Sequence, residues 1–354
     1  MECGKLTESI YERSIVKVVK TNTITNKKFY EGAGLGADCA ALTDSSLTGI
    51  LSGQAMAFGW DSKVAARAYI ASVNHAVACS AGCRGKELSE NIFANLTVLV
   101  PERLREIKVR AMIQEAALQA DRAGIPLLAC NVQVLPVAEE PMAVCSVSAG
   151  FDDSEVSQTR TKNSVQADKE IVMTKWIGLE GTAVIADQSG EILRRRYPSD
   201  IVSEAAGFYR YLSVAAEAAC AVKSGANYLH VPREGGIFGG LWQLAAENGV
   251  GLVIDLKKIP VRQETIEVCE FFDLNPYELL AGGCLLIITD NGSALVRALK
   301  ESGISSAVIG RTTQGNDRMI CHEEEVRYLE PARKDALYAY RLAVEKRNKK
   351  GEKS

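Results

Sequence analysis

The fold is decided by the stretch Ile171-Val172-Met173-Thr174-Lys175-Trp176-Ile177-Gly178-Leu179-Glu180-Gly181-Thr182-Ala183. Its β-branched opening predicts a strand over 170–175, and the segment 179–182 predicts the start of a helix. Working outward, we predict strands over 91–100, 127–135, 142–150, 227–230, 251–255, 284–289 and 306–310, and helices over 4–20, 62–79, 102–123, 208–224, 237–248, 263–272 and 292–302. Strands that alternate with helices in both halves predict the α/β or α+β fold class.

The chain is long enough for more than one domain. It holds 354 residues, and a domain commonly holds about 100–200, so two domains are expected. Residues 151–169 are polar and have few apolar anchors, which predicts an interdomain linker. The predicted organisation is therefore an N-terminal domain over 1–150, this linker, a C-terminal domain over 170–330, and a charged helix or tail over 331–354.

Composition excludes several classes of protein. Apolar residues make up 47% of the chain and charged residues 24%, which argues against long disorder or a coiled coil. The charge sum of 41 − 44 = −3 shows no basic excess, so we expect no nucleic-acid partner. No apolar run reaches the roughly 18 residues of a membrane helix, and no signal peptide is apparent, so we expect no membrane contact and a cytoplasmic location. The ten cysteines form no Cys-x-x-Cys pair, and we expect most to be buried packing residues.

A glycine-rich segment over 32–40 reads GAGLGADCA. Gly32, Gly34 and Gly36 leave backbone amides open to a phosphate. Asp38 follows them directly and is placed to hold a divalent cation against that phosphate. No buried strand precedes the segment and no Gly-Lys-Ser/Thr is present, which disfavours a dinucleotide or Walker-type site. A plain glycine-rich turn is the alternative interpretation.

A second segment over 230–236 reads HVPREGG and lies between a predicted strand and a predicted helix. Gly235 and Gly236 offer an anion the unpaired N–H groups and the dipole of a helix N-terminus. His230 or Glu234 could act as an acid, a base or a substrate-orienting group. The alternative is a tight turn with a hydrogen-bonded structural histidine. For the segment 175–182 we favour a role in packing and helix capping.

In this order, the segments resemble the aminoimidazole ribonucleotide synthetase (PurM-like) superfamily, in particular the proteins similar to hydrogenase maturation factor HypE. The resemblance covers roughly residues 4–340. It rests on 4–6, 32–40, 171–183, 230–236, 249–252, 259–262 and 308–311. The C-terminal half carries the more specific part.

The resemblance implies a fold and a reaction class. In the family, each half is an α/β domain, two N-terminal domains pair their sheets into a dimer barrel, and a nucleotide lies in a cleft nearby. A homodimer is therefore expected. Members use ATP and Mg²⁺ to phosphorylate an oxygen, commonly of an amide or carboxamide, and catalysis rests on positioning and charge neutralisation. By resemblance, Asp38 would hold the metal, and Arg233, Gly235 and Gly236 would contact the phosphate-bearing ligand.

The departures from the family pattern concern its metal site. Where the family has acidic motifs, this chain reads LSGQ over 51–54, VNHAV over 73–77 and ACNVQ over 129–133. Asp38 is the clear survivor of the N-terminal carboxylates, and Asp61 is a nearby substitute. Two or more carboxylates usually hold Mg²⁺ against a triphosphate, so one alone predicts weak metal binding. Arg233 stands where the family has Thr and could bind an anion directly.

Three functions stay open at this point. The leading hypothesis is a HypE-like protein with a cleft for a nucleotide or another phosphate ligand and a degenerate metal site. One alternative is an intact ATP-dependent enzyme that phosphorylates an amide, carboxamide or carboxylate oxygen. Another is a non-catalytic scaffold or regulatory partner of a second protein.

Overall fold

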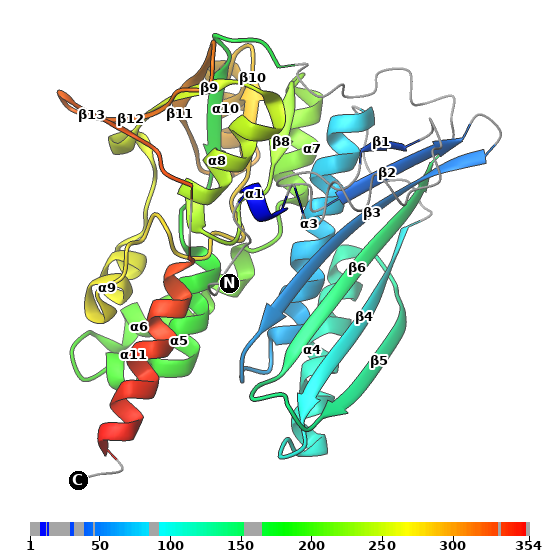
Figure 1. The fold of residues 1–354 in the computed structure, drawn as a ribbon, viewed down its shortest axis with the longest axis vertical. Coiled ribbons are helices and arrows are strands. Elements are labelled where there is room, and N and C mark those ends of the chain that lie inside the picture. Colours follow the sequence, from blue (N-terminus) through cyan, green and yellow to red (C-terminus); the bar gives the residue numbers. More distant parts are fainter. Residues whose placement is uncertain are drawn as a thin grey trace. The chain divides into compact units, whose positions relative to one another are not determined.

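The computed structural model describes residues 8–11, 13, 29–31, 39–44, 47–84, 92–151, 165–331 and 334–351. The chain separates into two compact units, each with its own sheet (Figure 1). We call Val16–Arg160 the N-terminal unit, and Thr161–Ser354 together with Met1–Ile15 the C-terminal unit. Helices and strands mix in both, so the predicted α/β (α+β) class is confirmed. In the part of the chain that is described, no helix combines the length and the apolar character that crossing a membrane requires.

The N-terminal unit is a six-stranded sheet with helices α3 and α4 on one face (Figure 1). The strand order is β1-β2-β3-β6-β4-β5, and β4–β5 is the parallel pair. Its elements are β1 (Phe29–Glu31), β2 (Cys39–Asp44), β3 (Leu47–Phe58), α3 (Val64–Arg84), β4 (Ile92–Pro101), α4 (Glu106–Ala123), β5 (Leu127–Leu135) and β6 (Met142–Phe151). Side chains of β4 and β6 alternate between buried and half-buried, so one sheet face is covered and the other is more open.

Small residues let α3 lie close to the sheet. A Cβ added at Gly53 of β3 would lie 2.8 Å from the backbone nitrogen of Ala76 and 2.8 Å from the carbonyl oxygen of Ser72, both in α3. Ala55 and Ala57 continue the buried side of the same strand. This stretch has few β-branched residues, and the sequence therefore did not predict a strand over Leu47–Phe58.

The C-terminal unit is built on a seven-stranded sheet in the order β13-β12-β9-β11-β7-β10-β8, with β12–β9 as the parallel pair. Its first half holds α1 (Glu8–Tyr11), β7 (Glu170–Thr174), α5 (Leu179–Leu193), α6 (Ser199–Ala206), η3 (Gly207–Tyr211), α7 (Ala215–Lys223), β8 (Tyr228–His230) and α8 (Gly236–Asn248). Its second half holds β9 (Gly251–Asp255), η4 (Leu256–Lys258), α9 (Gln263–Phe272), β10 (Leu286–Thr289), α10 (Gly292–Glu301), β11 (Ser306–Thr313), β12 (Arg318–His322), β13 (Glu325–Tyr328) and α11 (Ala336–Gly351). The core lies between sheet and helices, and Met173, Leu241 and Ile288 are fully buried in it.

The predicted continuous helix over 208–224 is wrong, because the chain forms η3, breaks, and resumes as α7. The buried ammonium of Lys175 explains the break. Its Nζ donates to the carbonyl oxygen of Tyr211 at 2.8 Å and to that of Ser213 at 2.6 Å, and it also pairs with Glu217 at 2.5 Å. Carbonyls inside a regular helix are already used by the helix, so the chain opens here to serve the lysine. The helix predicted over 4–20 lies mostly outside the described residues.

Candidate functional site

The segment 230–236 forms a sealed turn between β8 and α8. Gly235 and Gly236 have φ of 80° and 66°, in the left-handed region that glycine tolerates. A Cβ at Gly236 would lie 2.3 Å from the carbonyl oxygen of Tyr277. The amide of Gly236 donates to the Arg233 carbonyl at 3.2 Å, and that of Phe238 donates to the Tyr277 carbonyl at 3.2 Å. The glycines thus allow the 277–282 segment to pack directly on the helix N-terminus.

Arg233 is held by a buried carboxylate. Its Nε and Nη2 donate to Glu180 Oε2 and Oε1 at 3.0 and 2.9 Å, and the two side chains are 8% and 2% exposed. This two-point pair ties the turn to the first turn of α5. Glu234 lies beside it, with its Oε1 3.8 Å from Arg233 Nη1, and its side chain is 25% exposed. Of the two neighbours, Glu234 is the one whose side chain reaches solvent.

The Gly235 amide, which the sequence analysis predicts as part of an anion site, donates its hydrogen bond to Asp335. Its Oδ2 accepts the N–H of Gly235 at 2.8 Å, and its Oδ1 accepts those of Leu280 at 3.2 Å and Leu337 at 2.9 Å. Burial raises the pKa of this carboxyl to about 7, against the lowering effect of the three amides. Sequence reasoning missed Asp335. The feature that could have identified it is its position as a helix N-cap, because an aspartate directly before an apolar helical segment is a common N-cap.

His230 belongs to a separate buried cluster. Its Nδ1 lies 3.3 Å from Glu247 Oε2, and Tyr228 donates its hydroxyl to the same carboxylate oxygen. Tyr228 and His230 sit two residues apart on β8, so they share one side of the strand. The His230 side chain is 6% exposed, and its Nε2 is buried without a hydrogen-bond partner among the described atoms. His230 and Arg233 therefore have different partners. Glu247 pairs with His230, and Glu180 pairs with Arg233.

The glycine motif remains a prediction from sequence. Gly32, Gly34, Gly36 and Asp38 lie outside the described residues, between β1 and β2. The metal role of Asp38 and the phosphate role of the three glycines therefore stay as predicted.

The family has acidic motifs where this chain has residues 51–54, 73–77 and 129–133, and none of these residues is a carboxylate. Gln54 is exposed on β3, and the backbone carbonyl of the same residue lies 3.1 Å from Nδ1 of the buried His75. Asp61, the nearby substitute, is itself buried. Its Oδ2 pairs with Arg67 at 2.9 Å and its Oδ1 accepts the backbone N–H of Lys63 at 2.9 Å. Among the described residues, no group of three or more His, Cys, Asp or Glu side chains is arranged to hold a metal ion.

The described cysteines divide between core and surface. Cys79, Cys145, Cys269 and Cys284 are buried and form no disulfide within the described residues, and Cys130 is exposed on β5. Burial raises the pKa of Cys145 to about 11 and the pKa values of Cys269 and Cys284 to about 12. Such thiols stay protonated and act as small apolar groups, as the sequence suggested.

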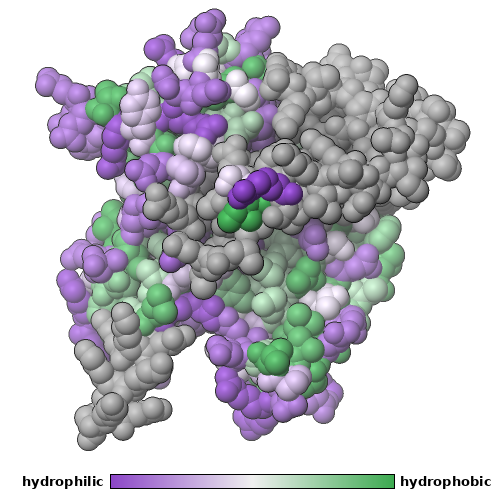
Figure 2. Space-filling model, viewed as in Figure 1, coloured by the Kyte–Doolittle hydropathy of each residue, from purple (hydrophilic) through white to green (hydrophobic). Residues whose placement is uncertain are grey.

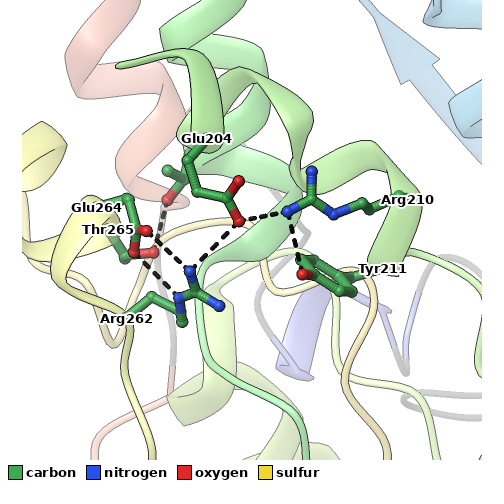
Figure 3. Close-up of polar contacts among 7 residues, drawn as sticks. Glu204, Arg210, Tyr211, Arg262, Glu264 and Thr265 are labelled. Atoms are coloured by element: carbon green, nitrogen blue, oxygen red, sulfur yellow. Dashed lines mark hydrogen bonds and ion pairs between the residues drawn. The ribbon is translucent and has the colours of Figure 1, made fainter. Parts of the chain in front are cut away.

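Arg262, from one of the family-like segments, closes a polar cluster on the helical side of the C-terminal unit (Figure 3). It donates from Nη2 to Glu264 at 2.8 Å and to Glu204 at 3.3 Å, and its guanidinium lies 5.0 Å from the ring centroid of Trp176. Arg210 donates to Glu204 from the other side (Figure 3). Two cations and two carboxylates balance here, so the cluster joins the α6–η3 segment to the start of α9.

Comparison with known proteins shows which proteins this chain is similar to. Residues 166–322 match the family model described as AIR synthase related protein, C-terminal domain. The match runs from β7 through the 230–236 turn to β12. Solved structures extend the likeness to the N-terminal unit: a chain of the HypE–HypF complex superposes with a TM-score of 0.67 at 17% identity, covering 90% of this chain and 99% of that one. This chain resembles the HypE-like proteins of the AIR synthase superfamily.

Two further proteins are similar to this chain. Carbamoyl dehydratase HypE of Rhizobium leguminosarum bv. viciae is 20% identical over 65% of this chain and 64% of its own length, which is less than two thirds of the relative. A HypE solved in complex with ATP has a TM-score of 0.65 at 15% identity, over 95% of this chain and 97% of that one. Likenesses at identities this low show the fold alone, and they leave the activity of this chain open.

Proposed function

We propose that this HypE-like chain binds ATP or another phosphate-bearing ligand through the glycine motif of its N-terminal unit. Support comes from the glycine-rich sequence of residues 32–36, a composition that suits phosphate binding, and from the fold that the chain shares with a HypE solved in complex with ATP. The amide of Gly235 and the guanidinium of Arg233 are engaged by Asp335 and Glu180. The 230–236 turn thus contributes less to anion binding than its sequence suggests.

We further propose that the metal site is degenerate. The observation that carries this step is the buried ion pair of Asp61 with Arg67, because a carboxylate neutralised by a guanidinium is a poor Mg²⁺ ligand. No described residue at the altered acidic positions replaces it. Asp38 alone would meet the metal, and the residues that are described do not fit the Mg²⁺-dependent triphosphate chemistry of the family.

Calorimetric titration of the full chain with ATP tests both steps. We expect weak binding that changes little when Mg²⁺ is added, and a further loss of affinity in Gly34→Val, whose side chain would block approach of a phosphate to the amides. Asp317→Asn, a change at an exposed aspartate of the C-terminal unit, is the control and should leave binding unaltered. Micromolar, Mg²⁺-dependent binding accompanied by ATP turnover would instead favour the intact ATP-dependent enzyme.

A homodimer formed through the N-terminal unit is the second part of the proposal. Strand β5 lies at the sheet edge, and residues 128–134 are all exposed. Leu128, Val132 and Val134 are 65%, 39% and 59% exposed, and apolar residues are visible on this unit in Figure 2. An exposed apolar edge strand favours pairing with another chain. A second copy of this chain is the occupant that the family dimer suggests.

The oligomeric state can be measured by light scattering coupled to gel filtration. The wild-type chain should elute with the mass of a dimer, and the double variant Leu128→Arg, Val134→Arg with that of a monomer. Ile107→Arg on α4, at a residue 68% exposed in the same unit, is the matched control and should stay dimeric. A monomeric wild-type chain would remove the dimer from the proposal.

The scaffold alternative gains one argument from the comparisons. A relative was solved as the HypE–HypF complex, so a HypE-like chain can serve as a partner of another protein. A pull-down with the full chain that recovers no stable partner would count against this role.

A further inference from the structure

Two buried side chains and one partly buried carboxylate meet at the end of α8 that lies away from the glycine turn. Tyr228 and His230 come from β8, and Glu247 comes from the last turn of α8. Glu247 Oε2 lies 3.3 Å from His230 Nδ1 and accepts the Tyr228 hydroxyl. The side chains of His230 and Glu247 are only 6% and 16% exposed. The cluster is thus a built polar unit inside the domain.

Helix stability does not explain a glutamate at this position. The C-terminal end of a helix carries partial negative charge, so an acid in the last turn costs about 0.3–1 kcal/mol. α8 has no basic residue in its last turn to offset that cost. Glu247 is instead paired with the two β8 side chains. We infer that the role of its carboxylate is this contact.

The carboxylate beside the ring favours one histidine tautomer. An ionised carboxylate only accepts hydrogen bonds, so a proton on His230 Nδ1, which lies 3.3 Å from Glu247 Oε2, is the favoured arrangement. In a neutral imidazole the other nitrogen is then a bare acceptor. That nitrogen, His230 Nε2, is buried and has no hydrogen-bond partner among the described atoms. The ring therefore presents an acceptor, which suits a hydrogen-bond donor such as an N–H group and not a phosphate oxygen.

We propose that Glu247 is a positioning residue that holds His230 in the Nδ1-protonated tautomer, with Nε2 as a proton acceptor. Tyr228 fixes the Glu247 carboxylate by donating to the same oxygen. Among the roles open to His230, this arrangement selects a base or an orienting acceptor over an acid. The inference goes beyond the proposed function, because it concerns side chains of the C-terminal unit alone and needs no nucleotide.

Nitrogen NMR of the full chain, labelled with ¹⁵N-histidine, tests the tautomer without any ligand. The chain has three histidines, so three imidazoles are observed, and His230→Gln assigns the relevant one. We expect wild-type His230 to show a protonated Nδ1 and a bare Nε2. In Glu247→Leu, which lacks the acceptor, the proton should move to Nε2, the form that a free histidine side chain prefers. Glu247→Asp, which keeps a carboxylate, should retain more of the original tautomer than Glu247→Leu.

A wild-type spectrum with the proton on Nε2 would overturn the proposal by itself, even if a variant fails to fold. An unchanged tautomer in a folded Glu247→Leu variant would overturn it as well. Glu323→Leu, at an exposed glutamate of the same unit, should leave the His230 signals in place. Because the spectrum is recorded without nucleotide, a chain that binds no ATP would refute the proposed function and leave this inference standing.

Discussion

Removing the Asp335 carboxylate should loosen the C-terminal unit at a single point. Asp335→Ala leaves the amides of Gly235, Leu280 and Leu337 without their acceptor. A buried N–H that loses its partner costs about 1–3 kcal/mol, and entry of water offsets part of the sum, so we expect a loss of about 3–5 kcal/mol in the free energy of unfolding. The loss should appear in the C-terminal unit, since all three amides belong to it.

Urea denaturation followed by tryptophan fluorescence measures this loss, because Trp176 and Trp242 lie in the C-terminal unit. Asp317→Ala, at an exposed aspartate of the same unit, is the control and should stay within about 0.5 kcal/mol of wild type. A loss below about 1 kcal/mol in Asp335→Ala would show that the three amides find other acceptors, and would refute the role given to this carboxylate.

The pH dependence of the same measurement follows from the raised pKa of Asp335. The folded state holds this proton up to a pH of about 7, and the unfolded chain loses it near its ordinary pKa of about 4. The folded state therefore binds more protons in between, so the stability of wild type relative to Asp335→Asn should fall as the pH rises from 4 to 7. The nearby charge of Glu234 also raises the pKa of Asp335. Glu234→Gln should therefore lower that pKa, and the fall in stability should end at a lower pH.

Gly53→Ala should destabilise the N-terminal unit by about 1–3 kcal/mol in urea denaturation, because the added Cβ overlaps the backbone of α3. Lys175→Met should speed amide hydrogen exchange around Glu217, since that carboxylate loses its cation and two carbonyls lose a donor. Arg233→Met should cost about 3–5 kcal/mol, because it leaves Glu180 buried and unpaired, and adding Glu180→Met should recover part of this loss in a double-mutant cycle.

Each of these three predictions has a control variant and an outcome that would contradict it. Gln54→Ala, at the exposed neighbour of Gly53, should have little effect, and an equal loss in both would remove the argument from close packing. Lys300→Met alters an exposed lysine and should leave exchange unchanged, so equal exchange in it and in Lys175→Met would contradict the clamp. Strict additivity of the Arg233 and Glu180 changes would mean that the two groups do not interact.

Local pattern was enough to predict much of the secondary structure. Strands β5 and β9 and helix α9 have the predicted bounds, because apolar residues mark each element and turn residues flank it. Strand β3 was missed since its small residues serve the approach of α3 rather than strand propensity. The break near Ser213 was missed because its cause, the Lys175 ammonium, lies 38 residues away in the chain.

The candidate site was predictable in part. His230, Arg233 and Glu234 were named as candidates from one short segment, and their roles stay predictions. The structure places Arg233 between Glu180 and Glu234, and it places His230 beside Glu247. Their partners were not predictable, because Asp335 and Glu247 come from distant segments that carry no motif of their own. A motif therefore names the residues of a turn, whereas the long-range contacts decide whether an amide or a guanidinium is left for a ligand.

The hydrogen bond from Gly235 to Asp335 also bears on how the protein is made. The two residues are 100 positions apart, so the turn cannot be closed until the ribosome has added a residue much later in the chain. The N-terminal unit is one continuous run from Val16 to Arg160 and is complete before the sheet of the C-terminal unit has been synthesised. During translation the glycine turn of α8 therefore spends a period with its amide uncapped, and the arrival of Asp335 ends that period.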